Sequence, residues 1–148
     1  WHDPSLDKSP EVFLVLEKMK ETGLDFALDV HGDEALPYNF IAGTEGIPSW
    51  SKRCEELQQT FKAAYVAASN GQFQTAHGYP VNAPGKANMT ICSNALAERF
   101  EALAMTLEMP FKDNADHPDP TYGWSPERAS KLGADVVEAM LAVLPTLR

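Results

Sequence analysis

The chain has 148 residues and is 44% hydrophobic, which is enough apolar material for one domain with a single core. Its 21 Asp and Glu residues outnumber its 12 Lys and Arg residues, and the formal net charge of -9 excludes a basic surface for nucleic acid or anionic membranes. We therefore expect no nucleic-acid partner and no membrane partner, and no apolar run reaches the roughly 18 residues of a membrane span.

The first half of the chain predicts two helices and two strands. A helix is indicated from Ser9 to Gly23, because a Ser-Pro pair precedes apolar residues at helical spacing and a glycine ends them. The segment from Leu24 to Val30 is mostly apolar, so we expect a strand buried on both faces, as at the centre of an α/β sheet. A short strand from Tyr38 to Ala42 and a helix from Ser51 to Ser69 follow.

The second half predicts a long loop, a strand and two more helices. Residues 70–88 form the loop, and a loop of this length in a compact domain often borders a functional site. We expect a short helix from Ser93 to Phe100, an apolar strand from Ala102 to Met109 and a surface loop from Lys112 to Gly123. A final amphipathic helix runs from Ser125 to about Leu144. Helices interleaved with apolar strands predict an α/β layered domain.

Two of the predicted strands end in residues with catalytic potential. The first reaches His31, and the second carries Glu108 shortly before a proline. In open α/β sheets, sites form beyond the carboxyl ends of strands, so these two side chains could face one cleft. Apolar neighbours would desolvate Glu108 and raise its pKa toward the range of a general base. The alternatives are an ion pair of Glu108 with Lys112 or Arg99, and a purely structural hydrogen bond for His31.

The segment His31 to Glu34 also has the HxxE spacing that can supply two zinc ligands. This pattern specifies only two residues, and a zinc site needs a third protein ligand and an open position for water. His2, His77 and His117 lie in segments without a supporting motif and are interpreted as ordinary surface or loop residues.

Two segments carry a resemblance to a known family. SPEVFLVLEKMKETGLDFALDVHGDEALPYNFIAG and LAMTLEMPFKDN resemble the C-terminal part of the catalytic domain of zinc metallocarboxypeptidases of the M14 type, with the cytosolic carboxypeptidase branch as the nearest match. The resemblance extends from Ser9 to about Asn114, and TLEMPF is its most specific part. It implies a three-layer α/β fold with a mixed, twisted sheet between helices. Residues 1–148 would form a partial domain of this kind.

The resemblance also implies an enzymatic activity. His31 would be the third ligand of one zinc ion, and Glu108 would be the general base and acid. Zinc would polarise the scissile carbonyl and lower the pKa of its water, while Glu108 would move the proton to the leaving amine. The implied reaction is the release of a C-terminal amino acid, with the C-terminus of a peptide or protein as substrate.

Parts of the family's site are missing from the sequence. In the family, an HxxE motif supplies the first two zinc ligands, and an Asn-Arg pair holds the substrate carboxylate. Both are expected upstream of Trp1, in another part of the same polypeptide. The chain starts without an initiator methionine, so we expect a processed product or the C-terminal piece of a longer protein. Alone, it is expected to bind zinc poorly and to be inactive.

Three further residues are weaker site candidates by the same resemblance. Tyr79 is the only tyrosine in the long loop, so it is the candidate for the tyrosine that closes over the substrate, although its spacing differs from that of the family. Arg99, together with Lys86, could favour an acidic C-terminal residue, with solvated charge as the alternative. Asp29 shares a strand face with His31 and could orient a ligand as a second-shell residue, or simply make a buried structural hydrogen bond.

Two other functions stay open at this point. One is a zinc amidohydrolase of the same superfamily that acts on N-acyl amino acids. The other is a noncatalytic α/β binding domain, in which the acidic loop from Asp113 to Asp119 would meet a basic partner. The two cysteines, Cys54 and Cys92, lie far apart without a CxxC motif, which indicates no disulfide framework and favours a reducing, cytoplasmic location.

Overall fold

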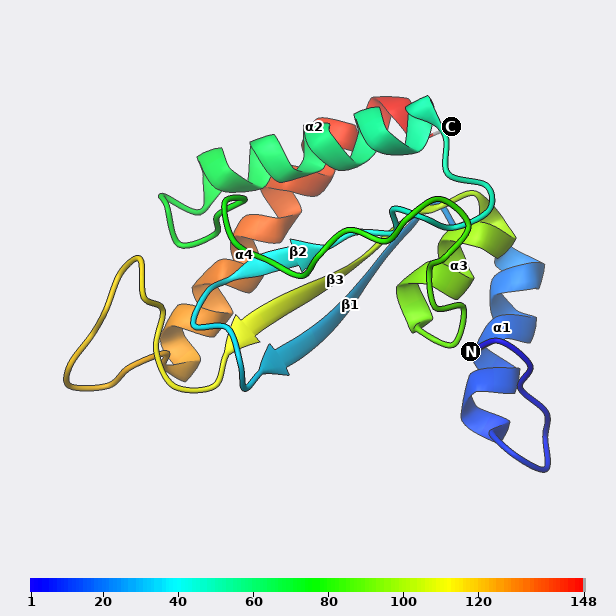
Figure 1. The fold of residues 1–148 in the computed structure, drawn as a ribbon, viewed down its shortest axis with the longest axis horizontal. Helices are drawn as coiled ribbons and strands as arrows, with labels where there is room; N and C mark the ends of the chain where they lie inside the picture. Colours follow the sequence, from blue (N-terminus) through cyan, green and yellow to red (C-terminus); the bar gives the residue numbers. More distant parts are fainter. Residues whose placement is uncertain (148) are drawn as a thin grey trace.

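The structure of the chain is a computed structural model that describes residues 1–147 (Figure 1). Its elements alternate as the sequence predicts. In chain order they are α1 (Pro10–Thr22), β1 (Phe26–Asp33), β2 (Phe40–Ala42), α2 (Lys52–Ala68), α3 (Cys92–Phe100), β3 (Leu103–Pro110), α4 (Pro126–Val143) and the 3-10 helix η1 (Leu144–Thr146). None of the helices within the described residues combines the length and the apolar character needed to cross a bilayer.

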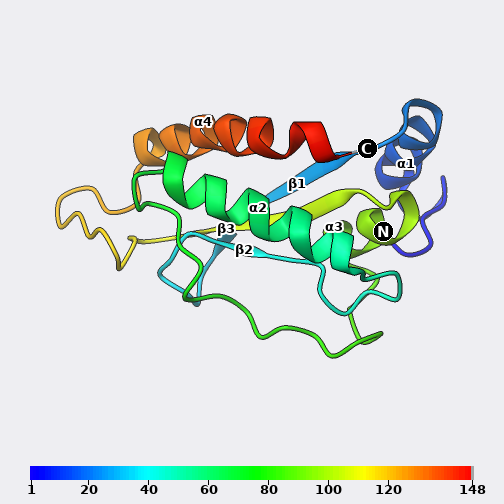
Figure 2. The same cartoon turned by 90° about the horizontal axis from the view of Figure 1, so that it is seen from above.

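The elements form three layers, with a mixed sheet between helices (Figures 1 and 2). Helices α2 and α4 pack together over one face of the sheet, and α1 and α3 lie on the other side. Each side has its own apolar cluster, because both faces of the central strand are covered. This is the α/β three-layer fold predicted from the sequence.

The sheet has the order β1-β3-β2, with β1 parallel and β2 antiparallel to β3. The central strand β3 is buried at nearly every position, whereas β1 is only partly buried and its end is exposed. The expectation that residues 24–30 form a strand buried on both faces is therefore wrong. Among the described residues, β1 pairs with a neighbour on one side only, and 56% of Val30 is exposed.

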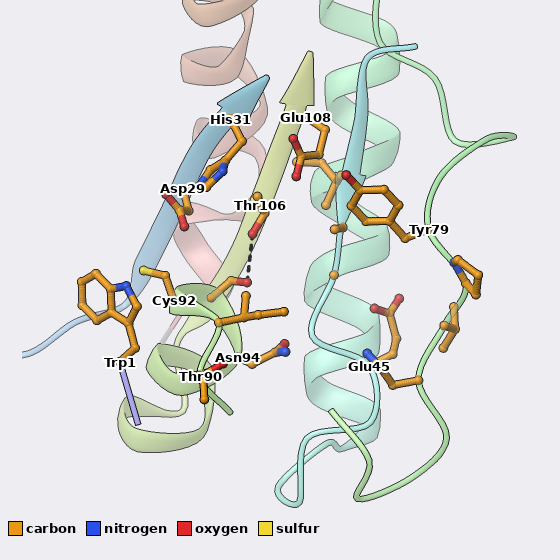
Figure 3. Close-up of a pocket in the computed structure, with 18 of the residues that line it drawn as sticks. Trp1, Asp29, His31, Glu45, Tyr79, Thr90, Cys92, Asn94, Thr106 and Glu108 are labelled. Carbon is orange, nitrogen blue, oxygen red and sulfur yellow. Dashed lines mark hydrogen bonds and ion pairs between the residues drawn. The ribbon is translucent and has the colours of Figure 1, made fainter. Parts of the chain in front are cut away.

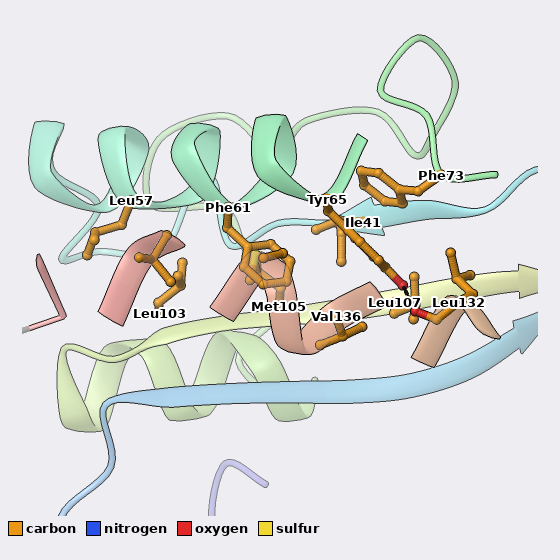
Figure 4. Close-up of a cluster of buried hydrophobic side chains, with 12 residues drawn as sticks. Ile41, Leu57, Phe61, Tyr65, Phe73, Leu103, Met105, Leu107, Leu132 and Val136 are labelled. Atoms are coloured by element: carbon orange, nitrogen blue, oxygen red, sulfur yellow. Dashed lines mark hydrogen bonds between the residues drawn. The ribbon is translucent and has the colours of Figure 1, made fainter. Parts of the chain in front are cut away.

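Alternate residues of β3 point to opposite faces of the sheet. Leu103, Met105 and Leu107 enter the larger apolar cluster, where they meet residues of α2 and α4 (Figure 4). In the same cluster the Tyr65 hydroxyl donates to the Leu132 carbonyl at 2.9 Å. The intervening side chains of β3, which include Glu108, therefore project toward the other face.

Two helices begin next to the serines at which the sequence predicts their start, and each of these serines caps its helix. The Ser51 hydroxyl accepts a hydrogen bond from the Cys54 amide at 3.3 Å, and the Ser125 hydroxyl accepts one from the Arg128 amide at 3.4 Å. Each bond satisfies an amide of the first turn that has no partner within the helix. These caps explain why the helix boundaries agree with the prediction to within one or two residues.

Candidate functional site

The two residues at the predicted strand ends come together in the structure. His31 of β1 and Glu108 of β3 are partners in the register of the parallel pair, two positions beyond the partners Asp29 and Thr106. Because side chains alternate along a strand, all four lie on the same face of the sheet (Figure 3). This face is opposite to the one that packs against α2 and α4.

A cavity of about 580 Å³ opens over this face. Its walls come from all three strands, the N-terminal end of α3, Lys62 of α2, residues 79–82 of the long loop, and Trp1. The loop predicted over residues 70–88 therefore borders this cavity through residues 79–82. A volume of this size is within the usual range for ligand sites.

Glu108 is a buried carboxylate in the wall of this cavity, with 7% of its surface exposed. Its pKa is raised, first by burial and then by the nearby carboxylates of Asp33 and Asp29, while His31 and Tyr79 act in the opposite direction. Its environment is therefore the desolvated one that the sequence predicts. Among residues 1–147 it forms no ion pair with Lys112 or Arg99.

His31 is a more exposed side chain, and its partner is Asp29. The His31 Nε2 atom lies 3.0 Å from Asp29 Oδ1, and 53% of the histidine side chain is exposed. Asp29 also interacts with the Cys92 thiol, whose pKa rises to about 12, mainly through burial and secondarily through the Asp29 carboxylate. Asp29 thus connects β1 to the start of α3 and holds the imidazole from one side.

The described side chains can supply one ligand of a zinc site, but not a complete set of ligands. A metal-bound imidazole commonly uses its second ring nitrogen to hydrogen-bond a carboxylate, and the His31–Asp29 pair has this chemistry. Within residues 1–147, no three His, Cys, Asp or Glu side chains are grouped so that they could hold a metal ion. Glu34 is exposed and does not line the cavity, so the HxxE spacing does not form a self-contained site.

Tyr79 of the long loop lies beside Glu108 in the cavity wall. Its ring packs edge-on against Phe40 with centroids 4.9 Å apart, and its hydroxyl points toward Glu108 (Figure 3). The pKa of Tyr79 is raised by burial and by the carboxylates around it, with Glu108 and Asp33 the strongest of them. The structure therefore brings together His31, Glu108 and Tyr79.

Contacts of residues 74 and 77 hold the long loop in place shortly before Tyr79. The rings of Tyr38 and His77 stack with centroids 4.1 Å apart. The Gln74 side chain donates to the His77 carbonyl at 2.9 Å and accepts from the His77 amide at 2.7 Å. The ring stacking attaches the loop to the segment that leads into β2, and the Gln74 bonds hold a turn within the loop.

Arg99 is not brought to the cavity. It lies exposed on α3, outside the cavity lining, and its guanidinium donates to the carbonyl of His2. Lys86 is also exposed and outside the lining. Neither residue therefore contributes a positive charge to the cavity.

Sequence reasoning did not identify the polar residues at the far end of the cavity, which are Glu45, Lys62 and Asn94. Lys62 Nζ lies 3.9 Å from Glu45 Oε1, and the same oxygen accepts a hydrogen bond from Gln58 Nε2 at 2.5 Å. One pattern in the sequence could have pointed to Lys62. Gln58 and Lys62 are polar residues four positions apart on α2, next to the apolar positions 57 and 61.

Comparisons with known proteins show which solved structures share this fold. A metallo-carboxypeptidase from Pseudomonas aeruginosa, solved in complex with (2-guanidinoethylmercapto)succinic acid, has a TM-score of 0.96 and 44% identity over 100% of this chain and 39% of its own. A putative carboxypeptidase A from Shewanella denitrificans has a TM-score of 0.95 and 54% identity over 98% of this chain and 38% of its own. A metallo-carboxypeptidase from Burkholderia cenocepacia has a TM-score of 0.91 and 40% identity, covering 99% and 38%.

The sequence comparison leads to a protein without a described function. An uncharacterized protein of Zymomonas mobilis is 44% identical over 147 residues, which are 99% of this chain and 38% of that protein. No family model matches the chain. The chain spans about two fifths of the length of these relatives. It has the fold of the corresponding part of the metallo-carboxypeptidase structures.

Proposed function

We propose that the chain is the C-terminal part of the catalytic domain of a zinc carboxypeptidase of the cytosolic branch, which removes the last residue of a peptide or protein. The observation that carries this proposal is the in-register pair of His31 and the buried Glu108 at an open cavity. The solved carboxypeptidases of the same fold support it. The ligand of the Pseudomonas complex is by its name a dicarboxylic acid, and a peptide C-terminus likewise offers a carboxylate.

In this proposal, the chain contributes one ligand to one zinc ion. His31 would hold the metal, Asp29 would orient the imidazole, and the other ligands would come from sequence upstream of Trp1. When bound, zinc supplies Lewis-acid chemistry toward the scissile carbonyl. A cytoplasmic location is proposed with it, because Cys54 and Cys92 are free thiols.

Glu108 performs the proton transfers in the proposed reaction. Its carboxylate takes a proton from the attacking water and delivers it to the nitrogen of the leaving amino acid. Its raised pKa suits both steps, because a base with a pKa nearer to neutrality can also return the proton. Tyr79, with its hydroxyl toward Glu108, would close over the substrate from the long loop.

The first test is hydrolysis of a short peptide by the full-length protein. Glu108→Gln should lower kcat by about 10²- to 10⁴-fold, which is the usual contribution of a general base. Glu21→Gln, an exposed glutamate on α1, serves as the matched control and should keep normal turnover. Normal turnover by Glu108→Gln would contradict the mechanism. An N-acyl amino acid is the comparison substrate, and its preferential hydrolysis would identify an amidohydrolase instead.

The second test is metal content. The full-length protein should contain about one tightly bound zinc ion, and His31→Ala should lose most of it, because one of three protein ligands is removed. His117→Ala, at an exposed histidine outside the cavity, should retain the metal. Elemental analysis after dialysis measures both. Full zinc occupancy in His31→Ala would show that this residue is not a ligand.

A further inference from the structure

The turn that ends α2 contains an Asn-Gly pair, Asn70–Gly71, which occurs nowhere else in the sequence. The last residue of the helix is Ala68, and the amide of the capping residue Ser69 donates to the Tyr65 carbonyl. Asn70 follows with a φ of 50° and Gly71 with a φ of 81°, so both lie in the left-handed region. Residues in this conformation are a common way for a helix to end.

The backbone conformation accounts for both members of this pair. A Cβ atom at residue 71 would lie 2.9 Å from His117 Nε2, and an L-residue is strained at this φ, so glycine is favoured there. Among residues with a side chain, asparagine is one of the few that adopt the left-handed region readily, which suits position 70. The Asn-Gly sequence is therefore a consequence of how α2 ends.

The groups that could react within this pair are free. Asn70 is exposed, and neither its side chain nor the Gly71 amide takes part in a hydrogen bond among the described residues. Because glycine has no Cβ atom, the Gly71 nitrogen is little hindered in approaching the amide carbon of the Asn70 side chain.

We propose that Asn70–Gly71 is a site of spontaneous deamidation, at which isoaspartate forms. The Gly71 nitrogen gives its proton to hydroxide and attacks Cγ of Asn70. A C–N bond forms, the bond from Cγ to Nδ2 breaks, and ammonia leaves with a proton from water, so that a succinimide ring closes. Water then opens the ring at either carbonyl carbon. The product is an aspartate with the normal backbone or an isoaspartate whose main chain runs through the side chain. This modification requires no catalytic activity of the protein.

The turn around the pair is closed by Ser69, so isoaspartate would disrupt it. The Ser69 carbonyl accepts a hydrogen bond from the Gln72 amide at 3.1 Å, and the Ser69 hydroxyl accepts one from the Phe73 amide at 3.1 Å. Both hydrogen bonds span the Asn70–Gly71 linkage. Isoaspartate lengthens the main chain between these partners by one carbon–carbon bond, about 1.5 Å, so at least one of the two hydrogen bonds should break.

Gln72, directly after the pair, connects three other segments. Its carbonyl accepts from Asn39 Nδ2 at 2.9 Å and from Asn114 Nδ2 at 3.1 Å, and both asparagines are fully buried. Its side-chain oxygen accepts from Arg128 at 2.9 Å. Displacement of Gln72 would leave these donors without their acceptor, which costs free energy. It would also loosen the start of the long loop that carries Tyr79.

The test is peptide mapping of the full-length protein after incubation at mildly alkaline pH. Asn70 and Asn82 lie in the same tryptic peptide, residues 63–86, and both are exposed, but Asn82 precedes Ala83. Because Ala83 carries a Cβ atom, Asn70 should convert at least about tenfold faster than Asn82, which corresponds to a barrier lower by about 1.4 kcal/mol. Electron-transfer fragmentation distinguishes isoaspartate from aspartate. Equal rates at the two asparagines, or no conversion at Asn70, would overturn the proposal.

Two variants separate the chemistry from its consequence. Asn70→Gly is compatible with the left-handed conformation and cannot deamidate, so it should unfold in urea at the same midpoint before and after incubation. Freshly purified Asn70→Asp has the charge of the product with a normal backbone, and it should unfold as the wild-type protein does. Incubated wild-type protein should contain a less stable fraction that equals its isoaspartate content. Isoaspartate at position 70 without such a fraction would overturn the proposed effect on Gln72.

Discussion

At the scale of single residues, the cavity combines groups whose protonation is set by burial. Glu108 and Cys92 are both held toward their neutral forms, because a low-dielectric surrounding penalises a charge. They differ in their neighbours: His31 partly offsets the effect at Glu108, whereas Asp29 adds to it at Cys92. The cavity therefore holds a carboxyl suited to proton transfer on β3 and an inert thiol at the start of α3.

The thiol provides a test that does not depend on activity. With a pKa of about 12 for Cys92, the thiolate fraction at pH 8 is on the order of 10⁻⁴, so iodoacetamide should modify it very slowly, and faster as the pH rises toward 12. Asp29→Asn removes a charge that raises this pKa and should speed the reaction. Asp116→Asn, at an exposed carboxylate outside the cavity, should not. Peptide mapping by mass spectrometry gives the rate, and a slower reaction in Asp29→Asn would contradict this account.

At the scale of elements, local signals predicted the helices well and the strands less well. Ser51 and Ser125 mark helix starts by a cap that depends only on nearby residues. Strand burial depends on which strands lie beside it, and this information is not local. The segment of β1 was therefore expected at the centre of a sheet, whereas among the described residues it is an edge strand.

The same distinction applies to the site. The positions of His31 and Glu108 followed from strand ends and from the resemblance to carboxypeptidases. Glu45, Lys62 and Asn94 come from three separate segments with no shared motif, and only tertiary packing brings them together. Arg99 is the opposite case. The resemblance made it a candidate for the pocket, but it does not line the cavity.

The loop over residues 112–123 depends on one side chain. Arg128 of α4 donates to Asp113 Oδ1 at 2.9 Å, to Gln72 Oε1 at 2.9 Å and to two loop carbonyls, and it lies over the Trp124 ring. The guanidinium thus joins α4, this loop and the end of the segment after α2. Because Asp113 is paired with Arg128, this acidic loop offers less free charge to a basic partner than its composition indicates.

Replacing Arg128 should therefore destabilise the fold. Arg128→Met should lower the free energy of unfolding by about 2 kcal/mol, because the Gly123 and His117 carbonyls and the partly buried Gln72 amide oxygen lose their donor. Arg128→Lys should recover only part of this, since an ammonium cannot reproduce the planar fork. Arg53→Met, which removes only an exposed bond to the Leu147 carbonyl, is the control. Urea unfolding followed by circular dichroism measures all three, and an unchanged midpoint for Arg128→Met would contradict the prediction.

At the scale of the whole molecule, the edge of β1 is the conspicuous open surface. One side of this strand is unpaired among the described residues, and Val30 is largely exposed there. Open strand edges are a liability that natural proteins usually cover. Since the chain spans about two fifths of its relatives, we expect the upstream part of the same polypeptide to cover this edge.

Hydrogen exchange can test this expectation. The outward-facing amides of residues 26–33 should exchange slowly in the full-length protein and quickly in residues 1–148 expressed alone, because pairing with a further strand protects them. The inward-facing amides, which pair with β3, should differ much less and provide an internal reference. Equal exchange of the outward amides in both proteins would mean that the edge stays open.

The alternation along β3 ties the proposed catalytic role of Glu108 to the register of this strand. Leu107 lies in the apolar cluster and Glu108, the next residue, lies in the cavity, so a slip of one residue would exchange the two environments. Such a molecule would be unstable and inactive for the same reason. In a preparation of the full-length protein, the fraction of molecules that carry out the proposed reaction should therefore report the fraction with correctly registered strands, and active-site titration would serve as a folding assay.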